Sequence, residues 1–183
     1  MNSNELTQST LLITGIMASG KSTIAQHMAE SIPNSVHLRG DVFRKMIVNG
    51  RAEMESPLSQ AAIDQLRLRY HLAALTANKY CESGFTVVYQ DVIIGEILND
   101  VIAMHSKHPL YIVVLCPSPD VVLNRDATRH KQTYHSWTPH MLDQGLKTET
   151  PKVGLWIDTS NLSVDDTIST IHRQLNQAKI SND

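Results

Sequence analysis

The stretch that decides the fold of this chain is Thr10-Leu-Leu-Ile-Thr-Gly-Ile-Met-Ala-Ser-Gly-Lys-Ser-Thr23. Its apolar start, residues 11–13, predicts a short buried strand. The next residues, from Gly15 to Ser22, fit the phosphate-binding pattern G-x-x-x-x-G-K-[ST] at every fixed position. Residues 23–32 then have the apolar spacing of a helix. Strand, loop and helix in this order are the context that a phosphate-binding P-loop requires.

Each fixed residue of this loop has a chemical reason. Glycines at 15 and 20 permit a positive φ and a close approach of the backbone to a ligand. The N–H groups of the loop and of the helix N-terminus can then surround phosphate oxygens. We expect the lysine to reach the β- and γ-phosphates and the serine hydroxyl to bind Mg²⁺. The predicted nucleotide-binding residues are Gly15, Ile16, Met17, Ala18, Ser19, Gly20, Lys21, Ser22 and Thr23.

Length and composition restrict the class of protein. A chain of 183 residues suits one domain, and 42% hydrophobic residues are enough for a buried core. The net charge of −2 provides no overall basic field to attract nucleic acid. No apolar run reaches the length of a membrane span, and the polar N-terminus lacks a signal-peptide core. Because Cys81 and Cys116 lie beside apolar runs, we expect reduced core thiols in a soluble cytoplasmic protein without a membrane partner.

Three further apolar runs and one short strand candidate at residues 35–39 predict strands, and helical segments alternate with them. The predicted strands are residues 35–39, 85–89, 110–116 and 154–157. The predicted helices are residues 43–48, 57–83, 93–104, 119–128 and 163–178. This alternation predicts a single α/β domain over residues 1–183, a three-layer α/β/α P-loop NTPase fold with a five-stranded parallel sheet. The polar, weakly periodic segment from Arg129 to Pro151 is expected to be a mobile lid and not a core element.

Ligands of such sheets bind beyond the carboxyl ends of the strands. The predicted strands are followed by Gly15, Asp41, Asp91, Pro117 and Asp158, so we expect these residues along one edge. Asp41 can act as the base that takes the proton of an acceptor hydroxyl, or bind the acceptor. The alternative is that Asp41 is only the N-cap of the next helix.

Asp91 follows an apolar strand, as the acid of a Walker B motif does. It can bind Mg²⁺ directly or through water, hydrogen-bond the acceptor, or cap the next helix, and the sequence leaves these roles open. Arg44 is our candidate for a further substrate contact near Asp41. Arg125 and Arg129 lie one helical turn apart, so they share a face and can neutralise charge on the transferred phosphoryl group. The alternative for this pair is a solvated helix end.

Together these residues resemble the small P-loop kinases, most closely the chloramphenicol phosphotransferase-like group, with shikimate and gluconate kinases further away. The resemblance rests on the P-loop, on Asp41, on the turn at residues 90–92 and on the Arg125/Arg129 pair. It implies that Asp41 is the base toward the acceptor hydroxyl. It also implies that the turn at residues 158–162 lies against adenine.

The chain departs from the shikimate-type pattern after its second strand. Those kinases have D-x-D at this position, and the first acid helps to hold magnesium, whereas this chain has Arg39-Gly40-Asp41. Magnesium is therefore left to Ser22, to the phosphates, to water and to Asp91. An arginine here also suggests an anionic or carbonyl-bearing acceptor.

These inferences predict an ATP- and Mg²⁺-dependent kinase that transfers the γ-phosphoryl group to a hydroxyl of a small molecule, such as an antibiotic, a sugar or a nucleoside. The alternative is a nucleotide-binding ATPase or switch that acts on a protein or RNA partner. A G-protein is excluded because the chain has no N-K-x-D motif. The single acid after the second strand and the lid-like segment favour the kinase.

Overall fold

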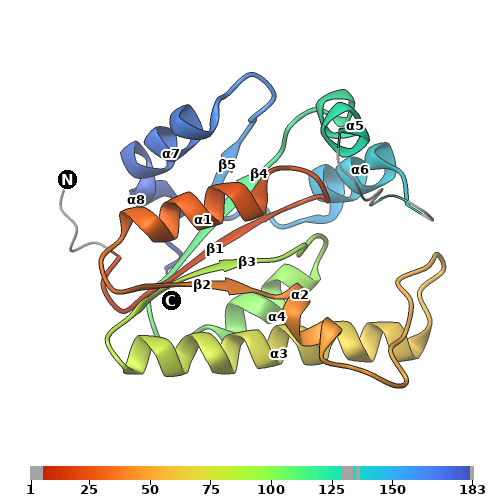
Figure 1. The fold of residues 1–183 in the computed structure, drawn as a ribbon, viewed down its shortest axis with the longest axis horizontal. Coiled ribbons are helices and arrows are strands. Elements are labelled where there is room, and N and C mark those ends of the chain that lie inside the picture. Colours follow the sequence, from red (N-terminus) through yellow and green to blue (C-terminus); the bar gives the residue numbers. More distant parts are fainter. Residues whose placement is uncertain (1–5, 129–133, 135–136, 182–183) are drawn as a thin grey trace.

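A computed structural model describes residues 6–128, 134 and 137–181, and it contains one five-stranded sheet (Figure 1). The strands lie in the order β2-β3-β1-β4-β5, and all four neighbouring pairs are parallel. This confirms the predicted parallel sheet. The strands are β1 (Thr10–Gly15), β2 (Ser35–Arg39), β3 (Thr86–Gln90), β4 (Leu110–Leu115) and β5 (Leu155–Ile157).

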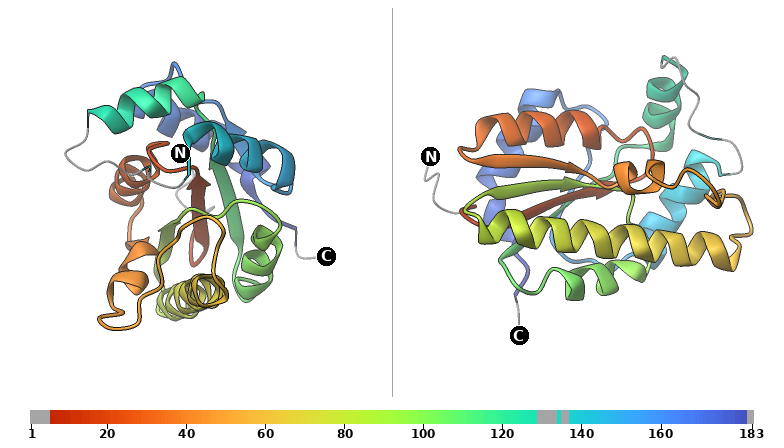
Figure 2. Two further views of the ribbon diagram at one scale, coloured as in Figure 1. Left: turned by 90° about the vertical axis from the view of Figure 1, so that its right-hand side faces the viewer. Right: turned by 60° about the horizontal axis from the view of Figure 1, so that its bottom comes forward.

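Helices cover both faces of the sheet, as Figures 1 and 2 show. The helices are α1 (Lys21–Ser31), α2 (Asp41–Lys45), α3 (Gln60–Glu82), α4 (Ile97–Met104), α5 (Pro119–Ala127), α6 (Pro139–Glu149), α7 (Val164–Arg173) and α8 (Leu175–Ala178). One face packs on α1, α7 and α8, and the other packs on α3 and α4. The predicted α/β/α layering is confirmed.

The central strand β1 explains the three layers. Its side chains alternate between two buried clusters, because successive residues of a strand point to opposite faces. Leu11 and Ile13 belong to the cluster with α1 and α7, whereas Leu12 belongs to the cluster with α3 and α4. All three side chains are fully buried. A strand that is apolar on both faces has to lie inside a sheet covered on both sides.

Parallel strands place their carboxyl ends at one edge of the sheet. The loop after β1, α2, α5 and α6 gather there, on the right of Figure 1, and the left view of Figure 2 looks onto this edge. The glycine that ends β1, Gly15, has φ +142, and a Cβ at this position would lie 2.3 Å from the Leu115 carbonyl oxygen. Only glycine fits where the chain leaves the sheet.

Several predicted helix boundaries are wrong. The long helix α3 starts at Gln60 and not at Pro57, because the Ser59 side chain caps it by accepting a hydrogen bond from the Ala62 N–H, at 3.2 Å. Helix α2 starts at Asp41 with Gly40 as its N-cap, so the prediction that Asp41 is the cap is also wrong.

Two other predicted helices differ from the structure in extent. Residues 93–96 lie outside α4, which begins at Ile97. The predicted C-terminal helix 163–178 is divided into α7 and α8 at Gln174.

The predicted lid contains a helix that sequence periodicity missed. Helix α6 begins after Thr138, whose side chain accepts a hydrogen bond from the Met141 N–H, and it has a proline in its first turn. Its Leu146 is fully buried in the cluster on the α3 side of the sheet. The prediction that residues 129–151 contain no core element is therefore wrong for α6. Its buried residues, Pro139, Asp143 and Leu146, are spaced as on one face of a helix, but they lie in a segment whose polar residues outnumber its apolar ones.

His105, at the C-terminal end of α4, predicts how stability depends on pH. The side chain is 1% exposed, its ring stacks on Tyr89 at 5.7 Å, and neither ring nitrogen has a hydrogen-bond partner in the structure. Burial lowers the pKa of His105 from 6.5 to about 4. Between these pH values the unfolded chain binds a proton that folded His105 does not, so the free energy of unfolding falls as the pH falls.

We expect His105 to account for a loss of up to about 3 kcal/mol between pH 7 and pH 4. Thermal unfolding across this pH range tests the prediction, with His105→Phe as the matched variant that keeps the stacked ring. The fall in stability should be shallower in the phenylalanine variant. Parallel pH profiles for both proteins would contradict the assignment.

No helix in the part of the chain that the structure describes combines the length and the hydrophobicity needed to cross a bilayer.

Candidate active site

The P-loop connects β1 to α1 and has the backbone geometry of a phosphate-binding loop. Gly20, the residue before α1, has φ +99, and Ala18 has φ +57. Lys21 is the first residue of α1, is only 7% exposed, and donates a hydrogen bond from Nζ to the Ile16 carbonyl oxygen at 2.7 Å. This contact folds the lysine side chain back over the loop, so its ammonium group lies where phosphate oxygens are expected.

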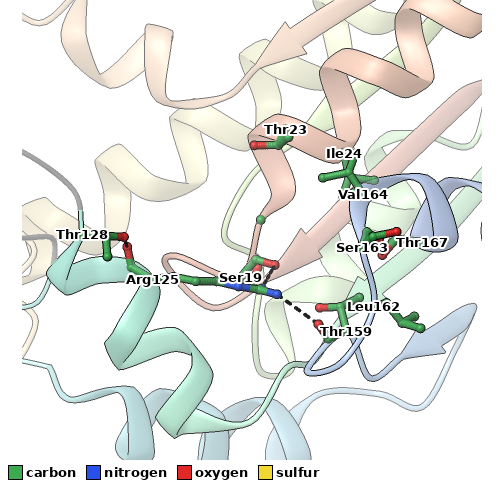
Figure 3. Close-up of a pocket in the computed structure, with 11 residues that line it drawn as sticks. Ser19, Thr23, Ile24, Arg125, Thr128, Thr159, Leu162, Ser163, Val164 and Thr167 are labelled. Carbon is green, nitrogen blue, oxygen red and sulfur yellow. Dashed lines mark hydrogen bonds between the residues drawn. The ribbon is translucent and has the colours of Figure 1, made fainter.

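A cavity of about 300 Å³ lies on one side of the P-loop (Figure 3). Two of its residues carry buried hydroxyl groups that have no hydrogen-bond partner in the structure: Ser19 Oγ and Thr159 Oγ1. Buried polar groups are normally satisfied, so each of these hydroxyls has hydrogen-bonding capacity left for a water molecule or a ligand. The cavity is lined by Ser19, Gly20, Thr23, Ile24, Arg125, Thr128, Thr159, Leu162, Ser163, Val164 and Thr167.

Arg125 holds two walls of this cavity together. Figure 3 shows its guanidinium group between the P-loop and the loop after β5. It donates to the Ser19 carbonyl oxygen at 3.3 Å and to the Thr159 carbonyl oxygen at 3.0 Å. The predicted adenine-contacting turn, residues 158–162, therefore lies beside the P-loop, with Thr159 and Leu162 in the cavity wall.

A second cavity, of about 290 Å³, lies on the other side of the P-loop. Gly20 lines both cavities, so the phosphate-binding loop separates them. The lining residues are Met17, Ala18, Gly20, Lys21, Ser22, Arg39, Asp41, Gln90, Asp91 and Val92. The carboxylates predicted after β2 and β3 thus come together with the P-loop lysine and serine. A ligand that lies along the P-loop and extends beyond Gly20 from one cavity would reach the other.

Asp41 presents an accessible carboxylate to the second cavity. It is the first residue of α2, with 47% of its side chain exposed, and it forms an ion pair with Lys45 one turn later. A negative charge at the start of a helix is favoured by the helix dipole. The role of Asp41 as the base stays a prediction.

Asp91 is buried, in contrast to Asp41. Its Oδ1 lies 2.8 Å from a guanidinium nitrogen of Arg69 on α3 and accepts from the Val92 N–H at 2.8 Å, and its Oδ2 accepts from the Tyr89 hydroxyl at 3.1 Å. Burial raises the pKa of Asp91, and the Arg69 guanidinium is the largest of the groups that oppose the rise. This ion pair was not predicted, because nothing distinguishes Arg69 from the other polar residues of α3 in the sequence.

Ser22, the predicted magnesium ligand, is hydrogen-bonded to Gln90. The Ser22 hydroxyl donates to Gln90 Oε1 at 3.3 Å. Among the described residues, no three His, Cys, Asp or Glu side chains are grouped so that they could hold a metal ion. Binding of Mg²⁺ would therefore depend on Ser22, on neighbouring oxygen atoms and on the phosphates of a nucleotide. Such a small set of protein ligands suits Mg²⁺, because this ion usually keeps several of its water ligands when bound.

Arg44, a predicted substrate contact, is not brought into the second cavity. Arg44 forms an ion pair with Glu53 at 3.0 Å and donates to the Ala52 carbonyl oxygen at 3.2 Å, so it lies against the loop between α2 and α3. Arg129 lies outside the described residues.

Two aromatic residues of the predicted lid contact the site. The Tyr134 hydroxyl donates to the Met17 carbonyl oxygen of the P-loop at 2.6 Å. The Trp137 indole N–H donates to the carbonyl oxygen of Met54, in the loop between α2 and α3, at 3.0 Å. The lid segment is therefore linked to the P-loop and to the loop between α2 and α3. Sequence reasoning missed both aromatics, because a hydrogen bond to a distant backbone leaves no local pattern.

Solved structures with this fold include several kinases. An unliganded sugar kinase from Janibacter sp. HTCC2649 aligns with a TM-score of 0.66 and 16% identity, over 93% of this chain and 95% of that chain. A gluconokinase from Sinorhizobium meliloti 1021 aligns with a TM-score of 0.63 and 18% identity, over 92% of each chain. The Mycobacterium tuberculosis APS kinase CysC, in complex with AMPPNP and APS, aligns with a TM-score of 0.63 and 17% identity, over 92% and 97%. At these identities the likeness shows the fold.

No curated protein matches the chain. The structural neighbours named above are P-loop kinases, which confirms the resemblance inferred from the sequence. The family model described as AAA domain matches residues 11–148. This range begins in β1, contains the P-loop and the residues after β2 and β3, ends within α6, and makes up well over half of the chain. The chain therefore belongs to the AAA domain family (AAA_33).

Proposed function

We propose that the chain is an ATP-dependent kinase that transfers the γ-phosphoryl group to a hydroxyl of a small molecule. The observation that carries the proposal is the position of the P-loop between two cavities that share Gly20. One cavity has buried hydroxyls suited to a nucleoside, and the other contains Lys21, Ser22 and the accessible carboxylate of Asp41. A kinase needs this separation, because nucleotide and acceptor approach the transferred group from opposite sides.

In this proposal the P-loop N–H groups and Lys21 hold the β- and γ-phosphates. Arg125 and Arg129 neutralise negative charge on the nucleotide. Asp41 takes the proton of the acceptor hydroxyl while the acceptor oxygen bonds to the γ-phosphorus. The bond from that phosphorus to the bridging oxygen breaks, and ADP leaves with the bonding electrons.

Ser22 is the residue that we propose to hold Mg²⁺. When bound, Mg²⁺ neutralises charge on the phosphoryl oxygens. The exposed Ser22 hydroxyl lies at the start of α1, beside the position of the phosphates. Gln90 Oε1, at 3.3 Å, keeps the hydroxyl oriented toward the second cavity.

The proposal is tested by ATP hydrolysis measured with and without a library of small alcohols that includes sugars, nucleosides and hydroxylated antibiotics. We expect one class of compound to stimulate ATP turnover strongly and to appear as a phosphorylated product in mass spectrometry. Turnover that no alcohol changes, but that RNA or a protein partner stimulates, would instead support the ATPase or switch function.

We further propose that residues 129–151 act as a lid that closes over bound nucleotide. Trp137 supports this, because its indole links the segment to the loop at Met54. A lid that closes changes the surroundings of this indole, so we expect a shift in its fluorescence when an ATP analogue binds.

The chain has two tryptophans, which makes the measurement selective. Trp156→Phe leaves Trp137 as the only tryptophan, and Trp137→Phe is the matched control. We expect the emission shift in the first variant and not in the second. Equal emission of Trp137 with and without the analogue, at concentrations shown by calorimetry to saturate the protein, would argue against a lid.

A further inference from the structure

The Asp91 carboxylate, at the carboxyl edge of the sheet, is buried and bound by several donors. Its two oxygens receive three donors, from Arg69, Val92 and Tyr89, at 2.8 to 3.1 Å. The side chains of the ion pair are buried, with 12% of Arg69 and 4% of Asp91 exposed. A buried carboxylate in such an arrangement has a fixed orientation, because any rotation breaks charge-assisted hydrogen bonds.

The same carboxylate lies directly against Gly40. A Cβ added at position 40 would lie 1.9 Å from Asp91 Oδ2 and 2.5 Å from its Cγ. The Gly40 N–H also donates to the Gln90 carbonyl oxygen at 3.1 Å. Gly40 thus lies between the Gln90 backbone and the Asp91 side chain, at the end of β3. Asp41 is the next residue along the chain.

The surroundings of Asp91 do not suit a magnesium ligand. A divalent cation bound to this carboxylate would lie beside the Arg69 guanidinium, and like charges this close in a buried site repel strongly. The Ser22 hydroxyl faces Gln90 and not Asp91.

We propose that Arg69 and Asp91 form a positioning pair. Arg69 holds the Asp91 carboxylate against Gly40, and this carboxylate anchors the turn that presents Asp41. Asp91 is therefore not a metal ligand. The inference rests on the proposed function for the role of Asp41. The anchoring and the absence of metal binding are properties of the protein that can be measured without an acceptor.

The main test variant is the double substitution Arg69→Met/Asp91→Ala. Removing both charges together leaves no unpaired buried charge and no change in net charge, which separates anchoring from electrostatics. The first measurement is Mn²⁺ affinity of the ADP-bound protein by electron paramagnetic resonance. We expect affinity within about threefold of the parent protein, whereas loss of a metal-binding or metal-orienting residue costs about 10- to 100-fold. Ser22→Ala is the control that should lose affinity.

The second measurement is amide hydrogen exchange. We expect the Gly40 amide to exchange at least about tenfold faster in the double variant, because its anchor is gone. The Thr86 amide, which donates to the Asn34 carbonyl oxygen at the opposite end of the same two strands, is the internal control and should not change. If the pair only stabilised the fold as a whole, its removal would raise the exchange rates of the Gly40 and Thr86 amides by the same factor.

The third measurement applies once an acceptor is known. We expect kcat to fall at least about tenfold with little change in KM for ATP, since the nucleotide side of the site is not altered. If the parent protein transfers phosphate to no acceptor, the proposed function fails, while the first two measurements still decide the anchoring. A tenfold loss of Mn²⁺ affinity, or an unchanged Gly40 amide, overturns the inference.

Gly40→Ala is the second route if the double variant does not fold. Its methyl group would displace the Asp91 carboxylate while leaving every charge in place. The same faster exchange at residue 40 with retained Mn²⁺ affinity is expected. Unchanged exchange there, or lost Mn²⁺ affinity, overturns the inference by this route as well.

Discussion

Lys21→Met is expected to abolish phosphoryl transfer while the protein stays folded. The lysine lies at the start of α1 with its ammonium group beside the P-loop carbonyl oxygen of Ile16. Removing a positive charge that stabilises the transition state should cost on the order of 3 kcal/mol or more, which is at least about a hundredfold in rate. Methionine keeps the buried aliphatic stem, so the variant separates the charge from the packing.

Lys21→Ala is the comparison for the methionine variant. Lys21 is only 7% exposed, so alanine leaves empty the space of the aliphatic stem that methionine fills. We expect both variants to be inactive and only the alanine variant to melt at a lower temperature. Turnover and thermal unfolding are measured on the same samples. Near-normal turnover in Lys21→Met would refute the assignment of the P-loop lysine.

Asp41→Asn is expected to lower kcat by about 10²- to 10⁴-fold, the usual contribution of a general base, with ATP affinity preserved. The substitution keeps the size of the side chain and removes only its proton-accepting charge. The side chain is about half exposed, and its ion partner is Lys45 on the same short helix. Exposed pairs of this kind contribute little to stability, so the fold should not change.

Lys45→Met is the matched control for this prediction. It removes the positively charged partner of the same ion pair and leaves the Asp41 carboxylate intact. We expect it to retain most of the activity, which would show that the loss in Asp41→Asn arises from the carboxylate and not from the broken pair. If Asp41→Asn keeps nearly full turnover while Asp91→Asn has none, the base is misassigned and the acceptor lies nearer β3.

The sequence alone determined the fold and predicted the nucleotide side of the site, because both depend on local patterns. Apolar runs identified four of the strands, the short segment at residues 35–39 gave the candidate for β2, and the spacing of Gly15, Gly20 and Lys21 identified the P-loop. The parallel connections then required that Asp41 and Asp91 lie at one edge, and both line the same cavity. Periodicity and motif spacing are properties of neighbouring residues, so they are readable without a structure.

Only the tertiary structure decided how the two carboxylates differ. In the sequence both follow an apolar strand, yet one is accessible at the start of α2 and the other is buried in an ion pair with Arg69. Helix α6 was missed because its polar residues outnumber its apolar ones, although the buried Leu146 fixes it to the core. The partners in each case lie far apart in the chain and meet only after the sheet has formed. Burial and ion pairing are set by these distant contacts, and no local pattern encodes them.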